Sequence, residues 1–175
     1  TSLWTNLAAG LFILPFFLFS STSGQLADKY DKRTLAVATK LLELVIVAVG
    51  AVGFWLHATG QQQTGVIVLL AALCLLGLQS TIFGPLKYAI LPQVLDQREL
   101  TGGNGLIEMA TFLAILVGSM IGSALIQHSD GAAWPIIAST LAVAGFGLAT
   151  AWAMPSAPAL DPGLKIDLNP LRETW

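Results

Sequence analysis

The chain has 175 residues, of which 55% are hydrophobic and only 10% charged, and its formal net charge is −2. Soluble domains carry roughly 25% charged residues, so this composition excludes a soluble globular domain, and the mean hydropathy of +0.75 makes lipid the expected solvent. The pI near 5.5 gives no indication of nucleic-acid binding. No cluster of His and Cys, Gly-rich phosphate loop or nucleophile–base pair in the sequence points to a metal, a cofactor or an enzyme active site.

Five apolar segments follow one another along the chain, each close to the ~20 residues needed to cross ~30 Å of hydrocarbon. Pro15 predicts a kink within the first segment, and Pro92 predicts a break after the third. The last part, residues 155–175, contains four prolines among scattered charges and is expected to form a cytoplasmic linker. We therefore predict an all-α membrane protein whose transmembrane helices cover residues 7–27, 35–56, 65–90, 104–126 and 135–154.

The loop at residues 24–33 sets the orientation, because it holds five charges in six residues between two nearly uncharged segments. Cytoplasmic loops of membrane proteins carry an excess of Lys and Arg. All eight Lys and Arg lie in or toward the loops on this side, and the opposite turns contain none. Trp4, Trp55 and Trp134 then fall at the outer interface, where aromatic side chains gather. This topology starts outside without a signal peptide, which predicts at least one further helix upstream.

The same loop carries a family resemblance. Its pattern Gly24-x-Leu26-Ala27-Asp28-x-x-x-Lys32-Arg33 resembles the signature loop between the second and third helices of the major facilitator superfamily, with Asp31 where the pattern usually has Gly. The Arg motif commonly found on the fourth helix is absent from residues 69–80, which argues against a proton antiporter.

A second resemblance concerns the substrate. Lys87-Tyr88-x-Ile90-Leu91, followed by Asn104-Gly105-Leu106-x-Glu108, is similar to the lysophospholipid transporters of Gram-negative inner membranes, some of which are fused to acyltransferase and acyl-carrier-protein synthetase modules. The resemblance implies helices two to six of a twelve-helix transporter, partnered by a missing N-terminal helix and a missing C-terminal half. It also implies that lysophospholipid is moved across the bacterial inner membrane for re-acylation. The alternatives are a facilitator for another amphiphile or drug, and a non-transporting membrane domain of an acyltransferase.

Charged residues inside the membrane are the candidates for substrate contact, because a charge at mid-bilayer costs ~2.5–3.5 kcal/mol on insertion scales. Lys87 and Glu108 are expected at similar depth on adjacent helices, so that an ion pair between them is one hypothesis. Lys40 and Glu43 lie three residues apart and are placed to pair on one helix. In the functional hypothesis Lys87 attracts the phosphate and Glu108 or Glu43 faces the amine. In the structural alternative, these pairs only fix helix packing. The expected substrate pathway comprises Lys87, Glu108, Asn104 and Glu43.

Two further groups of residues have expected roles. The resemblance implies that the loop acts as a gate through Gly24, Asp28, Lys32 and Arg33, with Asp28 and Arg33 holding the missing half; the alternative is a loop that only sets topology. Gly118 and Gly122 form a small-xxx-small pattern and are expected to allow close helix packing.

Overall fold

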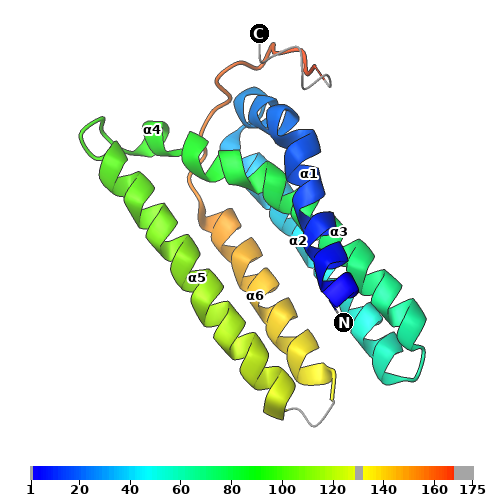
Figure 1. Cartoon of the computed structure of the whole chain (residues 1–175). Helices are drawn as coiled ribbons and strands as arrows, with labels where there is room; N and C mark the ends of the chain where they lie inside the picture. The colour runs from blue at the N-terminus through cyan, green and yellow to red at the C-terminus, as the bar shows by residue number, and fades with distance from the viewer. Residues whose placement is uncertain (1, 129–131, 168–175) are drawn as a thin grey trace.

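The computed structural model describes residues 2–128 and 132–167 of the chain, and this part is helical apart from short connections and the segment after residue 153. The long helices are α1 (Ser2–Lys29), α2 (Lys32–Ala58), α3 (Gln62–Ala89), α5 (Leu100–His128) and α6 (Trp134–Ala153), and α4 (Leu91–Val94) is a single turn (Figure 1). All five long helices are apolar enough and long enough to cross a membrane. The predicted all-α fold with five transmembrane helices is confirmed.

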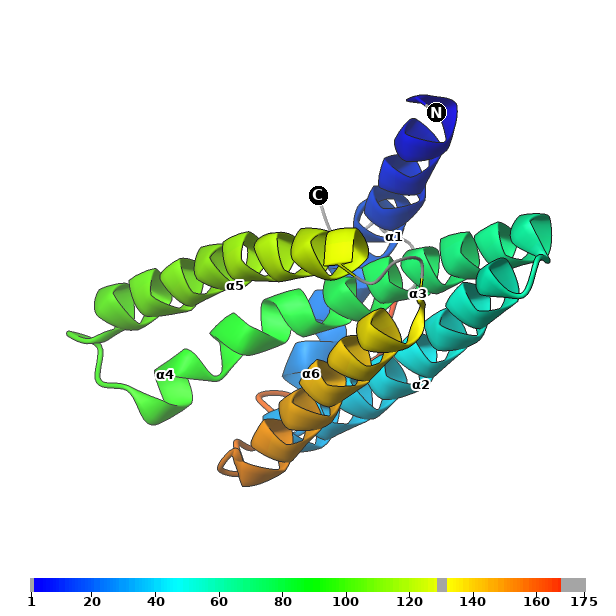
Figure 2. The same cartoon turned by 90° about the horizontal axis from the view of Figure 1, so that it is seen from below.

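Four of the five long helices pack together, and α5 lies apart from them. Both α1 and α2 pack along α3, and α6 packs along α2, whereas α5 contacts α4 and α6 only sparsely. Figures 1 and 2 show α5 at one edge of the molecule, away from α1 and α2. None of the described side chains on α5 is buried. The packed core of this chain therefore lies between α1, α2, α3 and α6.

Close approach of α1 to α3 depends on a glycine. A Cβ at Gly77 would lie 3.1 Å from the carbonyl carbon of Phe12 and closer still to its oxygen. On the other side of α3, a Cβ at Gly65 would lie 2.7 Å from the backbone nitrogen of His57 on α2. Small residues allow helix backbones in a membrane to approach closely, and here they allow α3 to contact both neighbours.

The prolines act differently along the chain. Pro15 and Pro85 lie inside α1 and α3, and both helices continue through them. The expected break occurs at Ile90, after which α4 begins with Pro92 in its first turn, where the missing N–H of proline costs no helical hydrogen bond. Pro92 thus starts a new helical turn instead of interrupting an existing one.

Residues after α6 do not leave the bundle. Figure 1 shows this segment crossing from the end of α6 to the C-terminal end of α1. Ala157 is only 1% exposed. The segment expected as a linker is therefore packed, over its described part, against the helix ends that flank the charged loop.

Candidate functional site

Three polar side chains meet inside the membrane between α2 and α3. Lys40 Nζ lies 2.7 Å from Glu43 Oε2, and the same oxygen accepts a hydrogen bond of 3.0 Å from Gln79 Nε2. We call Lys40, Glu43 and Gln79 the α2–α3 charge cluster. The ammonium of Lys40 also lies 4.6 Å from the ring centroid of Phe83, a favourable cation–π distance. The local pairing of Lys40 with Glu43 is confirmed, and its link to α3 through Gln79 was not foreseen.

Lys87 bonds to Thr111, and not to Glu108 as the sequence suggested. Its Nζ donates a 3.1 Å hydrogen bond to Thr111 Oγ1 on α5, and it lies 5.0 Å from the ring centroid of Tyr88. The ion pair with Glu108 is not formed in the described structure, so that hypothesis was wrong. Thr111 lies three residues beyond Glu108, or ~4.5 Å further along the helix. The predicted depth of α5 relative to α3 was thus wrong by less than one helical turn.

The face of α5 that meets Lys87 carries the other expected pathway residues. Asn104, Glu108 and Thr111 follow one another at spacings of four and three, so they lie on one face of the helix. Asn104 and Glu108 are both exposed in the described structure. A lysine has three donors, and Lys87 uses one of them on Thr111. Lys87 of α3 therefore contacts this face of α5 about one helical turn from Glu108.

The charged loop is built around Asp31, the position that departs from the family pattern. Asp31 caps α2, because its Oδ1 accepts from the Thr34 N–H at 2.8 Å and from the Thr34 hydroxyl at 3.1 Å. Its Oδ2 accepts from the Ala157 N–H at 3.1 Å. Burial raises the pKa of Asp31, but these hydrogen bonds together with the Arg33 N–H outweigh it and hold the pKa below 3.8.

The proposed gate residues lie around this cap. Lys32 is completely buried, and its Nζ has no hydrogen-bond partner among the described residues. Arg33 Nη2 donates 2.8 Å to the Trp152 carbonyl of α6. Asp28 acts here through its backbone carbonyl, which accepts from residues of the segment after α6. Nothing lies within 4 Å of a Cβ built at Gly24.

Gly118 and Gly122 face open space in this chain, since nothing lies within 4 Å of a Cβ at either position. They are not used for packing among the described helices. Their role in close packing stays a prediction about a helix that does not belong to the described residues.

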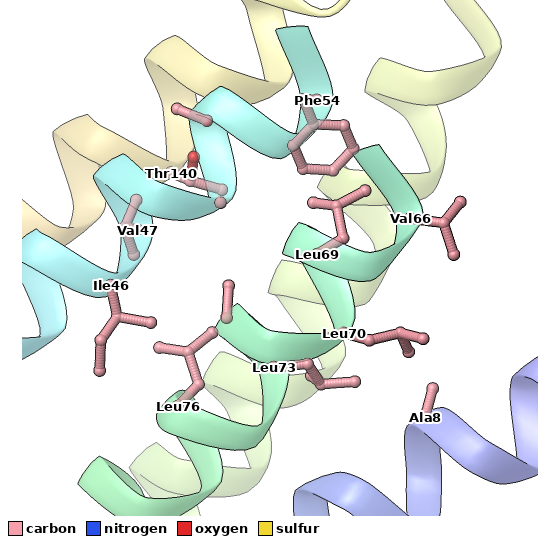
Figure 3. Close-up of a pocket in the computed structure, with 13 residues that line it drawn as sticks. Ala8, Ile46, Val47, Phe54, Val66, Leu69, Leu70, Leu73, Leu76 and Thr140 are labelled. Atoms are coloured by element: carbon pink, nitrogen blue, oxygen red, sulfur yellow. The ribbon is translucent and has the colours of Figure 1, made fainter. Parts of the chain in front are cut away.

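An apolar cavity of about 400 Å³ lies along the seam of α2 and α3 (Figure 3). Phe54, Leu69 and Leu73 are among the side chains that line it, with Ala8 of α1 and Thr140 of α6 at its edges. These mainly apolar side chains favour a hydrocarbon chain and provide no partner for a charged group. The cavity is therefore separate from the charged positions described above.

Comparison with known proteins places this sequence in a family. The family profile described as Major Facilitator Superfamily matches residues 3–171. The lysophospholipid transporter LplT of Cronobacter sakazakii is 30% identical over 168 residues, which cover 94% of this chain and 38% of that protein. LplT of Klebsiella pneumoniae is 28% identical over 165 residues, covering 94% and 38%, and LplT of Salmonella heidelberg is 30% identical over 165 residues, covering 94% and 37%.

The chain thus spans less than two fifths of the length of these relatives. No solved structure matches it. The family match nevertheless extends over nearly the whole sequence, in agreement with five membrane-spanning helices and a signature loop between the first two. This multi-pass membrane chain belongs to the Major Facilitator Superfamily.

Proposed function

We propose that the intact protein transports lysophospholipid across the bacterial inner membrane, from the outer to the inner leaflet, where it is re-acylated. The observation that carries the proposal is the position of Lys87, an intramembrane cation between α3 and α5 that uses one of its three N–H donors on Thr111. The names of the relatives support this substrate class. The alternating motion would be that of superfamily transporters, in which one helical bundle rocks against another around a central site.

The head group of a lysophospholipid matches the two charges on this face. Lys87 would hold the phosphate, because an ammonium forms strong charge-assisted hydrogen bonds with phosphate oxygens. Glu108, about one helical turn away, would face the amine of an ethanolamine head group, and Asn104 would add a polar contact. The ring of Tyr88 beside Lys87 keeps that ammonium in place.

Glu43 is not assigned to the amine in this proposal. Its carboxylate oxygen Oε2 already accepts from Lys40 and Gln79. A carboxylate that is neutralised within its own bundle has little charge left for a substrate. We therefore give the α2–α3 charge cluster a structural role, holding α2 to α3.

Re-acylation at the inner leaflet requires an acyltransferase. The resemblance described in the sequence analysis implies that a fused acyltransferase module supplies that activity, and the coding sequence of the intact protein tests this implication. An acyltransferase signature there without six further helices would favour the non-transporting membrane domain instead.

The proposal is tested by uptake of lysophosphatidylethanolamine into vesicles containing the intact transporter. Loss of a charge-assisted hydrogen bond costs ~1.5–3 kcal/mol, so Lys87→Ala should lower kcat/KM by about 10- to 150-fold at 1.4 kcal/mol per decade. Lys165→Ala, which removes the same charge from the cytoplasmic segment, is the matched control. Uptake by Lys87→Ala at the wild-type rate and normal expression would overturn the role of Lys87.

Glu108 has its own test, which uses head groups with and without an amine. Glu108→Gln should weaken uptake of lysophosphatidylethanolamine while leaving lysophosphatidylglycerol nearly unchanged, because only the first carries an amine. An equal loss for both lipids would refute the assignment of Glu108 to the amine. A drug panel run in parallel decides between lysophospholipid and another amphiphile.

A further inference from the structure

A second pocket lies at the end of the bundle where α2 connects to α3. It has a volume of about 590 Å³, and its lining includes Trp4 of α1, His57 of α2, and Gln62, Gln63 and Val66 of α3. Figure 1 shows this end of the molecule opposite the connection between α1 and α2, so it lies on the predicted outer side of the membrane. Sites for small molecules usually have ~300–1,000 Å³. We call this space the outer polar pocket.

The side chains of the outer polar pocket match a head group that carries both a phosphate and an amine. His57, Gln62 and Gln63 are exposed, and their side chains form no hydrogen bond with the described part of the chain. Each glutamine amide has two N–H donors for phosphate oxygens, and the exposed indole of Trp4 offers its ring face to an ammonium. The described residues that line the pocket include no Lys, Arg, Asp or Glu, so a head group without net charge fits it best.

The outer polar pocket adjoins the apolar cavity between α2 and α3. Val66 lines both of them (Figure 3). From Val66 the cavity follows α3 as far as Leu76, which is ten residues or ~15 Å along the helix axis. Half of the ~30 Å hydrocarbon core, the depth of one leaflet, is the same length. Polar and apolar spaces therefore follow each other here in the order of a lipid head group and its chain in the outer leaflet.

The volume of the cavity indicates one hydrocarbon chain. Apolar cavities stay dry and bind hydrocarbons, and one of ~150 Å³ holds benzene, a molecule of six carbons. On that scale, a cavity of about 400 Å³ holds about 16 carbons. This is one acyl chain, whereas an ordinary phospholipid would bring two.

The face of α3 that lines the cavity also carries Lys87. Leu76, Ser80 and Lys87 follow one another at spacings of four and seven residues, about one and two helical turns. Lys87 lies in the last turn of α3, and Gln62 and Gln63 lie in the first. The outer polar pocket and Lys87 are thus at opposite ends of one helix, in the order that movement from the outer to the inner leaflet requires.

We propose that the outer polar pocket and the apolar cavity together form a capture site for a lysophospholipid in the outer leaflet. The phosphate binds to the amides of Gln62 and Gln63, the amine lies against Trp4, and the single acyl chain lies between α2 and α3. This inference rests on the proposed function, because it names the place where the transported lipid enters the protein.

The experiment is histidine footprinting of the intact transporter in phosphatidylcholine nanodiscs, with diethyl pyrocarbonate as reagent and mass spectrometry as readout. His57 lines the pocket, and His128, exposed on the same predicted side, is the internal reference. Lysophosphatidylethanolamine at about nine times its Kd should slow the modification of His57 about tenfold, because only the unoccupied fraction reacts. His128 should react as before, and glycerophosphoethanolamine, the head group without a chain, should protect neither residue. Unprotected His57 in the wild type would overturn the proposal.

Ala51→Leu tests the apolar half of the site, because Ala51 lines the cavity. Displacing two methylene groups of the chain should raise the lipid concentration for half-protection of His57 about tenfold. Ala48→Leu is the matched control, since Ala48 lies on the same helix, is exposed and does not line the cavity. Unchanged protection in Ala51→Leu with a wild-type unfolding temperature would mean that another helix of the intact protein fills the cavity, and the proposal would fail.

Gln63→Leu tests the polar half, and it decides alone if Ala51→Leu does not fold. Loss of one hydrogen bond to the phosphate should raise the concentration for half-protection about 2- to 12-fold. Gln61→Leu, the same change two residues earlier and outside the pocket lining, should have no effect. Equal protection in Gln63→Leu and Gln61→Leu would refute the phosphate contact.

Lys87→Ala separates the capture site from the proposed function. His57 should remain protected in this variant, because Lys87 lies at the other end of α3; loss of protection would show that the capture site is not a separate one. Wild-type protein that takes up lysophospholipid without protecting His57 would refute the capture site alone. Protection of His57 in a protein that transports no lysophospholipid would refute the proposed function and leave a lipid-binding site.

Discussion

The α2–α3 charge cluster allows a structural role to be separated from a role in transport. Glu43→Gln leaves the Lys40 ammonium uncompensated inside the membrane. Removing one partner of a buried ion pair costs ~3–5 kcal/mol, whereas replacing both by neutral groups of similar size is often neutral or stabilising. Both side chains are 19% exposed, so we expect a loss near 3 kcal/mol, at the low end of that range.

The corresponding variants form a double-mutant cycle. Lys40→Met and Glu43→Gln should each destabilise the intact transporter, and the double variant should recover most of the loss. The expected coupling energy is therefore ~2–3 kcal/mol, at the upper end of that seen for contacting residues. The measurement is the free energy of unfolding of the four proteins in the same lipid or detergent. Additive effects of the two substitutions would show that the pair contributes nothing as a pair and would refute the structural role.

Transport by the double variant then decides whether Glu43 contacts substrate. Because Glu43 Oε2 is taken by Lys40 and Gln79, we expect lysophospholipid uptake by the double variant within about twofold of wild type, a difference of ~0.4 kcal/mol. A double variant that is as stable as wild type but does not transport would return Glu43 to the substrate pathway.

Three further predictions concern packing, pH and the head-group site. Gly77→Ala should destabilise the bundle by ~1–3 kcal/mol, the usual cost of overpacking, because its Cβ would press on the Phe12 carbonyl; an unchanged unfolding temperature would contradict this close contact. Since the pKa of Asp31 is lowered from 3.8 on folding, its ionised form stabilises the fold fully above that value and the stabilisation is lost as the pH falls below it. The difference in stability between wild type and Asp31→Asn should accordingly be constant from about pH 8 to pH 5 and shrink in more acidic buffer, whereas a difference that already changes near neutrality would contradict the hydrogen bonds at Asp31. Thr111→Val should raise the KM for lysophospholipid about 2- to 12-fold, the equivalent of one hydrogen bond, because Lys87 loses its fixed position; a fall in kcat alone would place Thr111 outside the binding step.

The length of the apolar segments predicted the helices well because lipid imposes a simple requirement on each segment separately. A run of apolar residues long enough to cross the bilayer must be helical, and the Lys and Arg of the loop at residues 24–33 indicate its side. The observed helices cover those spans except for their last residue at Ile90 and Met154, and they extend beyond them elsewhere, as α1 does by starting at Ser2. None of this required knowledge of which helix is next to which.

Contacts between helices were harder to predict, because they depend on relative depth and rotation. Glu108 was expected as the partner of Lys87, but the observed partner is Thr111, three residues further along α5. The predicted depth of α5 relative to α3 was wrong by these three residues. Gln79 was overlooked because an amide within an apolar run has no charge to mark it, although polar side chains in a membrane need partners. The docking of Ala157 on Asp31 joins positions 126 residues apart, and no local pattern encodes it.

The intramembrane charges of this chain divide into two kinds, and the division indicates where function lies. Each charge placed at mid-bilayer costs ~2.5–3.5 kcal/mol. At Lys40 and Glu43 that cost is offset inside the bundle by an ion pair. At Lys87 and Glu108 it is not, because neither has an ion-pair partner among the described residues, and Lys87 contacts only the Thr111 hydroxyl and the ring of Tyr88 there.

Charges that remain uncompensated in a folded bundle must be compensated by something that the bundle contacts. On α5 the same helix also leaves Gly118 and Gly122 open, so its exposed surface is suited both to another helix and to a bound molecule. A second helix alone would favour small and apolar groups there, and it would not account for a carboxylate placed one turn from a lysine-bearing site. The zwitterionic head group that we propose as substrate would account for both charges at once. We therefore expect substrate selectivity to change on mutation of the face shared by α3 and α5, and not on mutation of the α2–α3 charge cluster.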